Sequence, residues 1–409
     1  MQCDIAPDFH NDSDIAEAEA ILRSCVHCGF CTATCPTYQV LGDELDGPRG
    51  RIYLIKDFLA GLPTSSESLT HLDRCLLCRA CETTCPSGVR YARLAEIGRR
   101  EMESRIGRPA NERVQRALLR SILPYPRRLR PLLRFAQLVK GVLRDDWARR
   151  IPDCPTSKVE RLGQGAEQPL VLLLAGCVQS VSTPNTTLAL QQILDYLGIA
   201  WRIPAAAGCC GALSRHLNAE EEALGFMRRN IDAWWPWVEQ GAQAILVSAS
   251  GCGSMLKEYG QALQHDLAYA AKARRIAEMA HDPGEWLLAQ DLELPAVAPR
   301  KNKVAFHSPC SLRHAQGLHG QIETLLQRAG YELLPVGDSH LCCGSAGTYS
   351  LLQPELANEL RQRKLSFLEA DSPDYIATAN VGCQLHLQQT SGVEVRHWLE
   401  LLSAVMPGK

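Results

Sequence analysis

The stretch CVHCGFCTATCP, residues 25–36, holds four cysteines with the spacing C-x2-C-x2-C-x3-C, followed directly by proline. The same pattern returns in CLLCRACETTCP, residues 75–86, with every cysteine displaced by 50 positions. Three thiolates within seven residues can reach three irons of one cubane cluster from a tight loop. The fourth thiolate, past a three-residue step and held by proline, points away from that cluster. The two runs therefore predict two [4Fe–4S] clusters that exchange their fourth ligands.

This ligand run resembles that of bacterial-type ferredoxins carrying two [4Fe–4S] clusters. The predicted ligands are Cys25, Cys28, Cys31 and Cys85 for one cluster, and Cys75, Cys78, Cys81 and Cys35 for the other. Zinc is the alternative. A tetrahedral zinc site built from C-x2-C pairs, however, has no role for the third cysteine of each C-x2-C-x2-C run or for the final Cys-Pro. Nearby arginines either raise cluster potentials or form ordinary caps and surface pairs. They are Arg49, Arg51, Arg74 and Arg79.

The composition argues against several other classes of protein. The 409 residues are 46% hydrophobic and 22% charged with a net charge of −2, a soluble balance without a basic footprint for nucleic acid. The N-terminal stretch MQCDIAPDFHNDSDI lacks the pattern of a secretory signal. The apolar run at 169–178 is about half the roughly 20 residues that span a bilayer. We therefore expect a cytoplasmic chain whose clustered cysteines bind metal rather than form disulfides.

A second cysteine repeat occupies the C-terminal part of the chain. Its copies are displaced by 133, 133, 133 and 131 positions. The first copy contains Cys177, Cys209, Cys210 and Cys252, and the second contains Cys310, Cys342, Cys343 and Cys383. Of the eighteen cysteines, only Cys3 and Cys154 lie outside the two repeats, and both are interpreted as incidental.

The apolar pattern changes along the chain. Residues 14–142 show helical periodicity, and Asp14 with Glu17 resembles a capping box at the start of the first helix. From 169 onward, short apolar runs such as AILVSAS and DYIATA alternate with helical segments, which indicates parallel sheets. The predicted fold is an all-α ferredoxin-type module, a basic helical linker and two α/β Cys-Cys-Gly lobes with parallel sheets. Their predicted bounds are 1–108, 109–168, 169–300 and 301–409.

The segment 105–150 contains thirteen Lys and Arg but only three acidic residues, with apolar residues between them. It forms either a solvated basic face on packed helices or a contact with a membrane surface or an acidic partner. Binding of nucleic acid is disfavoured, because no aromatic platform accompanies the charge.

Nucleotide-binding motifs are missing from the sequence. No G-x-G-x-x-G follows a predicted strand, the nearest match being SGCGSM at 250–255, and no G-x-x-x-x-G-K-[ST] occurs. We therefore expect neither flavin nor NAD on this chain. Iron–sulfur clusters cannot by themselves take a hydride from an organic substrate, so electrons must come from and go to other components. This pattern favours a subunit of a complex.

Tandem Cys-Cys-Gly lobes behind a two-cluster module resemble the iron–sulfur subunits of membrane-associated respiratory enzymes. These include anaerobic glycerol-3-phosphate dehydrogenase, lactate-utilisation proteins and heterodisulfide reductase. More narrowly, four long stretches resemble the iron–sulfur subunit of glycolate oxidase, and the resemblance covers nearly the whole chain. They are CVHCGFCTATCPTYQVLGDELDGPRGRIYLIK, HLDRCLLCRACETTCPSGVRY, NIDAWWPWVEQGAQAILVSASGCGSMLKEYG and SHLCCGSAGTYS.

The resemblance implies partner FAD-binding subunits that oxidise glycolate to glyoxylate, with D-lactate as a second substrate. Electrons would pass through this chain to a membrane acceptor such as quinone, at the cytoplasmic side of the inner membrane. The alternatives are the iron–sulfur subunit of another 2-hydroxy-acid or glycerol-3-phosphate dehydrogenase, and a thiol or disulfide reductase of the heterodisulfide type.

The Cys-Cys-Gly lobes depart from the family pattern. In the family each lobe reads C…CCG…C-x2-C, whereas here Ala249 and Asn380 replace the first cysteine of the last pair. The four thiols left in each lobe are candidates for a further iron–sulfur cluster or metal ion, for redox thiols, or for plain buried cysteines.

Overall fold

The computed structural model describes residues 3–9, 12–143, 148–149, 151–153, 155, 157–163, 167–290 and 302–406. By packing, the chain divides into two compact units. The first is formed by Met1–Ala117 with His340–Lys364, and the second by Leu118–Ser339 with Leu365–Lys409. The segment His340–Lys364 of the second cysteine repeat thus groups with the N-terminal module. The predicted domain bounds stay predictions, and the bound at 300 lies outside the described residues, as does Cys154.

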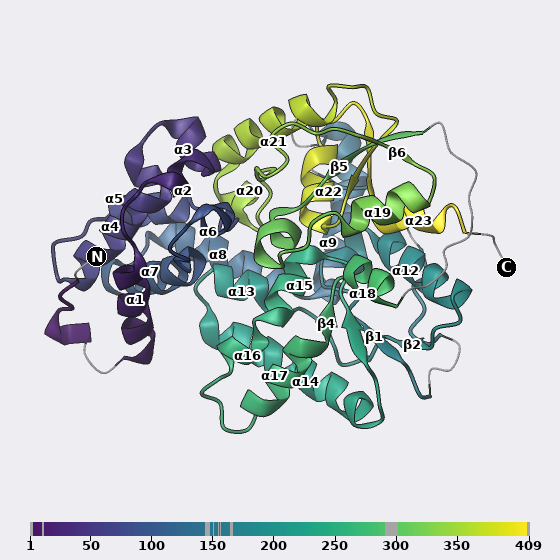
Figure 1. Cartoon of the computed structure of the whole chain (residues 1–409), viewed down its shortest axis with the longest axis horizontal. Helices are drawn as coiled ribbons and strands as arrows, with labels where there is room; N and C mark the ends of the chain where they lie inside the picture. Colours follow the sequence, from purple (N-terminus) through teal and green to yellow (C-terminus); the bar gives the residue numbers. More distant parts are fainter. Residues whose placement is uncertain are drawn as a thin grey trace. The chain divides into compact units, whose positions relative to one another are not determined.

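The first unit is helical, as the sequence predicts, and none of the described residues from 12 to 143 forms a strand. Its elements run from purple to blue in Figure 1, with two late helices from the segment that joins this unit. They are η1 (Pro7–Phe9), α1 (Ser13–Ser24), α2 (Phe30–Ala33), α3 (Pro36–Leu41), η2 (Glu44–Asp46), α4 (Pro48–Leu59), α5 (Ser66–Asp73), α6 (Ala80–Thr84), α7 (Tyr91–Ile106), most of α8 (Ala110–Ile122), α20 (Tyr349–Leu352) and most of α21 (Pro354–Leu368).

Helix α1 is held against α7 by ion pairs. Its N-cap is Asp12, whose carboxylate accepts the N–H of Asp14 at 2.8 Å. The predicted capping box is therefore wrong, because Asp14 and Glu17 instead pair with Arg93 of α7 at 2.6 and 2.8 Å. These pairs close one side of an apolar core that includes the fully buried Leu22.

The second unit contains two four-stranded parallel sheets, one in each cysteine repeat. The strand order is β2-β1-β3-β4 in one sheet and β6-β5-β7-β8 in the other, so the duplicated sequence folds twice into the same topology. The strands are β1 (Val171–Leu173), β2 (Trp201–Arg202), β3 (Ala244–Leu246), β4 (Ala280–His281), β5 (Lys303–His307), β6 (Glu332–Leu334), β7 (Tyr375–Thr378) and β8 (Glu394–His397).

Helices connect and cover these strands, as parallel pairing requires. They are α9 (Pro126–Val139), η3 (Lys140–Val142), α11 (Gln179–Ser182), α12 (Pro184–Tyr196), α13 (Ala212–His216), α14 (Glu220–Glu239), α15 (Ser250–Lys257), α16 (Tyr259–Ala262), α17 (Ala270–Met279), α18 (Pro283–Ala289), the π-helical turn η4 (Ser311–Ala315), α19 (Gln321–Arg328), α22 (Val381–Gln388) and α23 (Trp398–Ser403).

The side chains of β1 alternate between two apolar cores. Val171 and Leu173 face a core that includes buried residues of both sheets, whereas Leu172 faces a core with α14 and α17. Burial on both faces explains why the strands read as continuous apolar runs. The shared core reaches α12 and α23, where Thr186 donates a hydrogen bond to Glu400 at 3.0 Å. The all-α module followed by two α/β lobes is thus confirmed.

Candidate iron–sulfur sites

Both N-terminal cysteine runs form loops with left-handed backbone at two equivalent positions. His27 and Gly29 have φ angles of 54° and 82° in the first run, and Leu77 and Arg79 have φ angles of 51° and 64° in the second. For the three residues other than glycine this conformation costs roughly 1–3 kcal/mol each. Because the same turns recur in both runs, the cysteine spacing itself requires them.

Two pockets gather the eight cysteines into the predicted sets. The first cluster pocket is lined by Cys25, Cys28, Cys31 and Cys85, and also by Cys81, which lines both pockets. The second cluster pocket is lined by Cys35, Cys75, Cys78 and Cys81. The fourth cysteine of each run therefore lies with the other three of its partner run. Eight thiols in two groups of four are the donor set that two cubane clusters need, and the ligand assignment stays a prediction.

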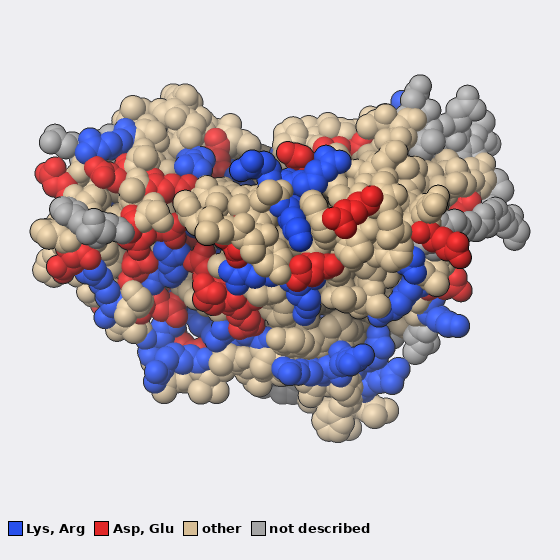
Figure 2. All heavy atoms as spheres, turned by 90° about the horizontal axis from the view of Figure 1, so that it is seen from below, with Lys and Arg blue, Asp and Glu red and all other residues tan. Residues whose placement is uncertain are grey.

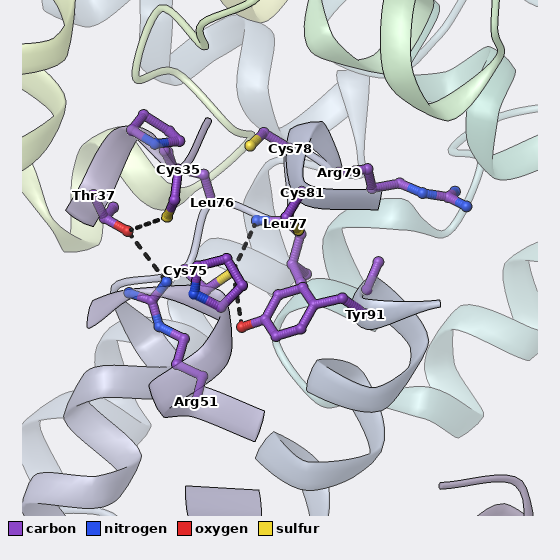
Figure 3. Close-up of a pocket in the computed structure, with 13 residues that line it drawn as sticks. Cys35, Thr37, Arg51, Cys75, Leu76, Leu77, Cys78, Arg79, Cys81 and Tyr91 are labelled. Atoms are coloured by element: carbon purple, nitrogen blue, oxygen red, sulfur yellow. Dashed lines mark hydrogen bonds between the residues drawn. The ribbon is translucent and has the colours of Figure 1, made fainter. Parts of the chain in front are cut away.

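Polar groups of the second cluster pocket face its sulfur atoms, as Figure 3 shows. Thr37 Oγ1 lies 3.3 Å from Cys35 Sγ, the Tyr91 hydroxyl donates to Cys75 Sγ at 3.7 Å, and the Leu77 N–H donates to the same sulfur at 3.4 Å. Burial raises the pKa of Tyr91 well above its usual value, and Cys75 raises it further, so the hydroxyl keeps its proton. The Tyr91 hydroxyl and the Leu77 N–H stabilise negative charge on the Cys75 sulfur, whereas the hydroxyl proton of Thr37 is donated to the Asp46 carbonyl.

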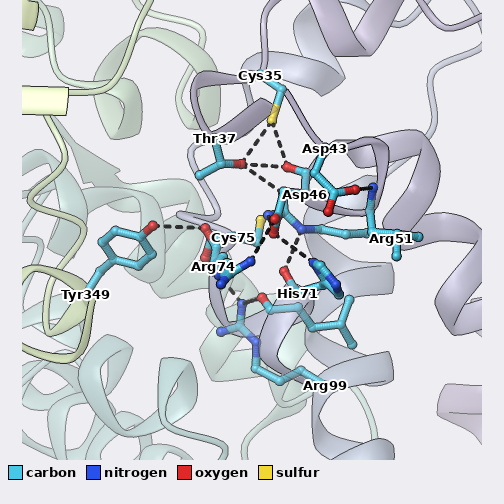
Figure 4. A network of polar contacts seen from close by, with 12 residues as sticks. Cys35, Thr37, Asp43, Asp46, Arg51, His71, Arg74, Cys75, Arg99 and Tyr349 are labelled. Atoms are coloured by element: carbon cyan, nitrogen blue, oxygen red, sulfur yellow. Dashed lines mark hydrogen bonds and ion pairs between the residues drawn. The ribbon is translucent and has the colours of Figure 1, made fainter. Parts of the chain in front are cut away.

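A buried ion network lies beside the same pocket (Figure 4). The Asp46 carboxylate, only 1% exposed, lies 3.3 Å from Arg51 Nη2, 2.9 Å from Arg74 Nη1 and 3.1 Å from His71 Nδ1. The guanidinium groups of Arg51 and Arg74 thus share the one carboxylate of Asp46, and these three side chains together carry a net positive charge. The backbone carbonyl of Asp46 also accepts a hydrogen bond from Thr37 at 2.8 Å.

Arg51 brings its positive charge close to the second cluster pocket. Its side chain is 1% exposed, and it donates to Thr37 Oγ1 at 3.1 Å and to the His71 carbonyl at 2.7 Å. Burial by itself would lower the pKa of Arg51, but the negative charge of Cys75 and its neighbours outweighs burial and raises it. The guanidinium therefore stays charged inside the protein. Among the four arginines singled out from the sequence, Arg51 is the only buried one.

The first cluster pocket contains an exposed cysteine. Cys28 is exposed, and Arg49, which lines the pocket, is 38% exposed and pairs with Glu44 at 2.6 Å. Burial, followed by the negative charge of Cys25, raises the pKa of Cys31 to about 11. A metal ligand must be a thiolate, so binding of iron has to displace this proton.

The first Cys-Cys-Gly lobe brings its four thiols together. Cys177 Sγ lies 3.7 Å from Cys209 Sγ, and side-chain hydrogen bonds join Cys210 to Cys209 and to Cys252. Hydrogen bonds from Cys177 and Cys210 lower the pKa of Cys209 well below its usual value, whereas the bond to Cys209 raises the pKa of Cys177. Cys209 therefore loses its proton more readily than Cys177. Soft metal ions bind cysteine in this deprotonated, thiolate form.

Two buried polar residues fix the backbone of this cysteine pair. Asn230 Nδ2 donates to the Cys209 carbonyl at 2.8 Å, and the Tyr259 hydroxyl donates to the Cys210 carbonyl at 2.8 Å. Our sequence analysis missed both residues. The available signal was a lone asparagine on the apolar face of a helix, since Asn230 is fully buried in α14.

The glycine after each cysteine pair has a steric role. Gly211 and Gly344 have φ angles of +93° and +90°. A Cβ atom would lie 2.9 Å from the Ala223 carbonyl oxygen at Gly211, and 2.5 Å from the Ala357 carbonyl oxygen at Gly344. These carbonyls belong to helices α14 and α21. Glycine therefore lets the Cys-Cys turn pack directly on a helix backbone.

The second-lobe cysteines are distributed over both compact units. Cys342 and Cys343 belong to the first unit, and Cys310 and Cys383 belong to the second. Asn380, which stands where the family pattern has a cysteine, directs its amide to Cys383 Sγ at 3.6 Å. The first-lobe set thus lies within one unit, whereas the second-lobe cysteines belong to two.

Comparisons with known proteins match these parts of the chain. Residues 21–89 match the 4Fe-4S dicluster domain family, and residues 171–257 and 304–388 match the cysteine-rich domain family. The chain is 49% identical over 406 residues to the glycolate oxidase iron-sulfur subunit of Escherichia coli K12, covering 99% of both chains. It is 29% identical over 398 residues to a probable glycolate oxidase iron-sulfur subunit of Bacillus subtilis 168, covering 90% of this chain and 89% of the relative.

A shorter relative is lactate utilization protein A of Anoxybacillus flavithermus. The two are 25% identical over 240 residues, which cover 57% of this chain and 98% of the relative. The long relatives, by contrast, match from the cluster runs through both Cys-Cys-Gly lobes. On its two cluster pockets, its duplicated lobes and its identity along nearly the whole length, the chain belongs to the family of glycolate oxidase iron–sulfur subunits.

Proposed function

We propose that this chain is the electron-transfer subunit of a complex that oxidises glycolate to glyoxylate, with D-lactate as a second substrate. The observation that supports this best is the lining of two pockets by the eight cysteines, of which Cys81 lines both. The substrate comes from the E. coli relative, a glycolate oxidase iron-sulfur subunit that is 49% identical over 99% of this chain. The expected cofactors are two [4Fe–4S] clusters.

The division of labour follows from the chemistry. Bound [4Fe–4S] clusters supply one-electron transfer and no hydride chemistry. Oxidation of a hydroxyl carbon removes two electrons, so we assign that reaction to partner FAD-binding subunits. This chain would hold its clusters by thiolates, bury several of the sulfur atoms, and donate hydrogen bonds to Cys75 from the Tyr91 hydroxyl and the Leu77 N–H.

We propose that the electron acceptor is a membrane component such as quinone, and that the chain contacts the membrane peripherally. None of the helices in the described residues is both long and apolar enough to cross a bilayer. Helices α9 and η3 nevertheless expose large apolar side chains, with exposed fractions of 48–85%. These residues are Leu132, Phe135, Leu138 and Val142.

Basic residues accompany these apolar side chains. No acidic residue occurs from 113 to 144, and α9 exposes Arg127, Arg128, Arg130 and Arg134. Figure 2 shows Lys and Arg side chains gathered along the lower edge of the face that it presents. A basic helix with exposed apolar side chains suits the interface of an anionic bilayer. This supports a contact at the cytoplasmic side of the inner membrane.

We further propose that the first-lobe thiols hold a metal ion or an additional cluster. Four sulfur ligands suit zinc or an iron–sulfur cluster, and Cys209 already has a lowered pKa because Cys177 and Cys210 donate to it. The second-lobe cysteines are candidates through the sequence repeat. Iron and sulfide analysis of Cys210→Ser and Cys343→Ser variants would show whether either lobe adds to the iron of the two N-terminal clusters.

The central test is metal analysis after anaerobic reconstitution. We expect about eight irons per chain and the EPR signals of two reduced [4Fe–4S] clusters. Cys35→Ser and Cys85→Ser should each affect a different cluster. A chain that binds two zinc ions and no iron would refute the assignment. Glycolate-dependent dye reduction that survives deletion of this chain from the cell would refute the substrate.

A second function, thiol or disulfide reduction, is favoured by one observation. Cys177 and Cys209 lie 3.7 Å apart, and the pKa of Cys209 is lowered by the hydrogen bonds that it accepts. A purified chain that alone turns over a disulfide substrate, with Cys209→Ser inactive, would support this function over electron transfer.

A further inference from the structure

The two cluster pockets share lining residues, but the polar group among these residues is directed to only one of the pockets. Tyr91, Pro48 and Cys81 line both pockets. The Tyr91 hydroxyl, however, is directed to the second cluster pocket, where it donates to Cys75 Sγ at 3.7 Å (Figure 3). A donor on a ligand sulfur favours the reduced, more negative state of a cluster. The Tyr91 hydroxyl therefore favours the reduced state of a cluster in the second pocket only.

The positive charge beside the second pocket is also less screened than the positive charge beside the first. Arg49 and Arg51 are two residues apart at the start of α4, but only Arg51 is buried. Arg49, beside the first pocket, is 38% exposed and pairs with Glu44. Solvent and this carboxylate weaken the field of Arg49, whereas a buried charge acts through a lower dielectric. Asp46 offsets only one of the two guanidiniums that it binds, those of Arg51 and Arg74.

Burial of the ligands acts in the opposite direction. Cys35 and Cys81 are buried, while Cys28 of the first pocket is exposed, and burial disfavours the added negative charge of a reduced cluster. The second pocket is not sealed, however, because Cys75 and Cys78 are only partly buried. A full guanidinium charge and the Tyr91 hydroxyl should outweigh this difference, because hydrogen bonds and charges in a low dielectric are the stronger terms.

We propose that Tyr91 and Arg51 raise the reduction potential of the cluster held by Cys35, Cys75, Cys78 and Cys81 above that of the other cluster. A single electron on the chain then resides in the second pocket. With both clusters bound, one would be oxidised as the other is reduced, and no proton would move, because the Tyr91 hydroxyl only donates a hydrogen bond. The inference rests on the proposed function as a two-cluster electron carrier. Tyr91 and Arg51 are both positioning residues here: Tyr91 acts through Cys75 Sγ, and Arg51 acts through its buried charge beside the pocket.

The test is an EPR-monitored redox titration of the full chain after anaerobic reconstitution. Cys25→Ser and Cys35→Ser variants assign the two midpoint potentials to their pockets. Tyr91→Phe removes a single hydroxyl and should lower only the higher potential, by about 59 mV, a tenfold change in one-electron exchange between the clusters. Arg51→Gln, which removes the charge, should lower the same potential by at least as much. Arg51→Lys keeps the charge and should lower this potential much less.

Arg49→Gln is the matched control, because it removes an exposed arginine beside the first pocket, and it should leave the second potential unchanged. An unchanged second potential in Tyr91→Phe, with iron content intact, overturns the proposal. A wild-type chain whose first pocket has the higher potential also overturns it. Should Arg51→Gln lose iron, Tyr91→Phe alone decides the proposal, because it removes one donor to Cys75 Sγ and no charge. A chain without two clusters would instead refute the proposed function, so the two failures are distinguishable.

Discussion

The Tyr349 hydroxyl donates a hydrogen bond to the backbone carbonyl of Arg74 at 3.0 Å, although 275 residues separate them. Figure 4 shows the tyrosine reaching the loop that carries Cys75 of the second cluster pocket. Tyr349 belongs to the segment His340–Lys364, which also carries the second Cys-Cys-Gly motif. One hydrogen bond thus joins that motif's segment to the second cluster loop within a single compact unit.

Tyr349→Phe should lower the free energy of unfolding of this unit by about 1–2 kcal/mol, because a carbonyl loses its donor at a buried site. Burial raises the pKa of Tyr349, so the hydroxyl stays protonated and the bond persists at neutral and mildly alkaline pH. Urea unfolding measures the change. Tyr53→Phe, at an exposed tyrosine of α4, is the control and should change stability by less than about 0.5 kcal/mol. Equal effects of the two variants would contradict the prediction.

Asp46→Asn should selectively damage the second cluster pocket. The substitution removes the carboxylate shared by Arg51 and Arg74 and leaves two like charges close together, at a cost of about 3–5 kcal/mol. We expect iron content to fall from about eight toward about four atoms per chain. Asp43→Asn is the control, because the side chain of Asp43 is exposed and its carboxylate accepts the Leu45 N–H, while its backbone bond to the Asp46 N–H is kept. Full iron content in Asp46→Asn would show that the network does not support the pocket.

Gly344→Ala should destabilise the protein more than Gly347→Ala. Both glycines have positive φ, so both substitutions carry the cost of left-handed backbone, roughly 1–2 kcal/mol. Only at Gly344 would the new Cβ also lie 2.5 Å from the Ala357 carbonyl oxygen, while Gly347 has open space. Thermal unfolding of the two variants measures the difference. Equal melting temperatures would mean that the turn can move away from helix α21.

The buried carboxyl group of Asp282 should make the stability of the protein depend on pH. Burial raises the pKa of this N-cap of α18 from 3.8 to about 7, so the folded state holds a proton that the unfolded state releases above pH 4. The contribution of Asp282 to stability is therefore greatest below about pH 4, falls as pH rises, and reaches its minimum above about pH 7. Asp282→Asn keeps the cap and carries no charge. The variant should gain a few kcal/mol relative to wild type between pH 4 and pH 8.

Urea unfolding of wild type and Asp282→Asn at pH 5 and pH 8 tests this sign. Glu285, the neighbouring acid on α18, has a pKa lowered to about 2 in the folded state; burial opposes this shift, but His281 and Lys257 outweigh it. It therefore contributes little to the difference between the two measurements. A stability difference between the two proteins that is the same at both pH values would contradict a raised pKa at Asp282.

The membrane contact predicts binding to vesicles that contain phosphatidylglycerol. Replacing Arg127, Arg130 and Arg134 by glutamine should weaken binding by about a hundredfold at low salt, at about 1 kcal/mol for each arginine. High salt should weaken wild-type binding as well. Arg275→Gln, at an exposed arginine of α17 paired with Glu278, is the control and should bind as wild type does. Vesicle co-sedimentation measures the binding, and equal binding by the triple variant would exclude α9 as the contact.

Local pattern predicted the parts of the fold that depend on near neighbours in the sequence. AILVSAS and DYIATA contain β3 and β7, because a strand buried on both faces needs a continuous apolar run. The capping box at Asp14 failed because a distant arginine, Arg93, takes both carboxylates. Asn230 and Tyr259 were missed for the same reason, since their partners lie on other elements of the fold.

By itself the sequence determined the spacing of the thiols, the two repeats and the helical or strand character of each segment, since these depend on covalent distance and periodicity. Only the tertiary structure decided that Tyr91 directs its hydroxyl to Cys75 and that Arg51 is buried while Arg49 is exposed. It also decided that the segment of Cys342 and Cys343 packs with the N-terminal module. Long-range packing sets these relations, because burial and hydrogen-bond direction depend on residues that are distant along the chain.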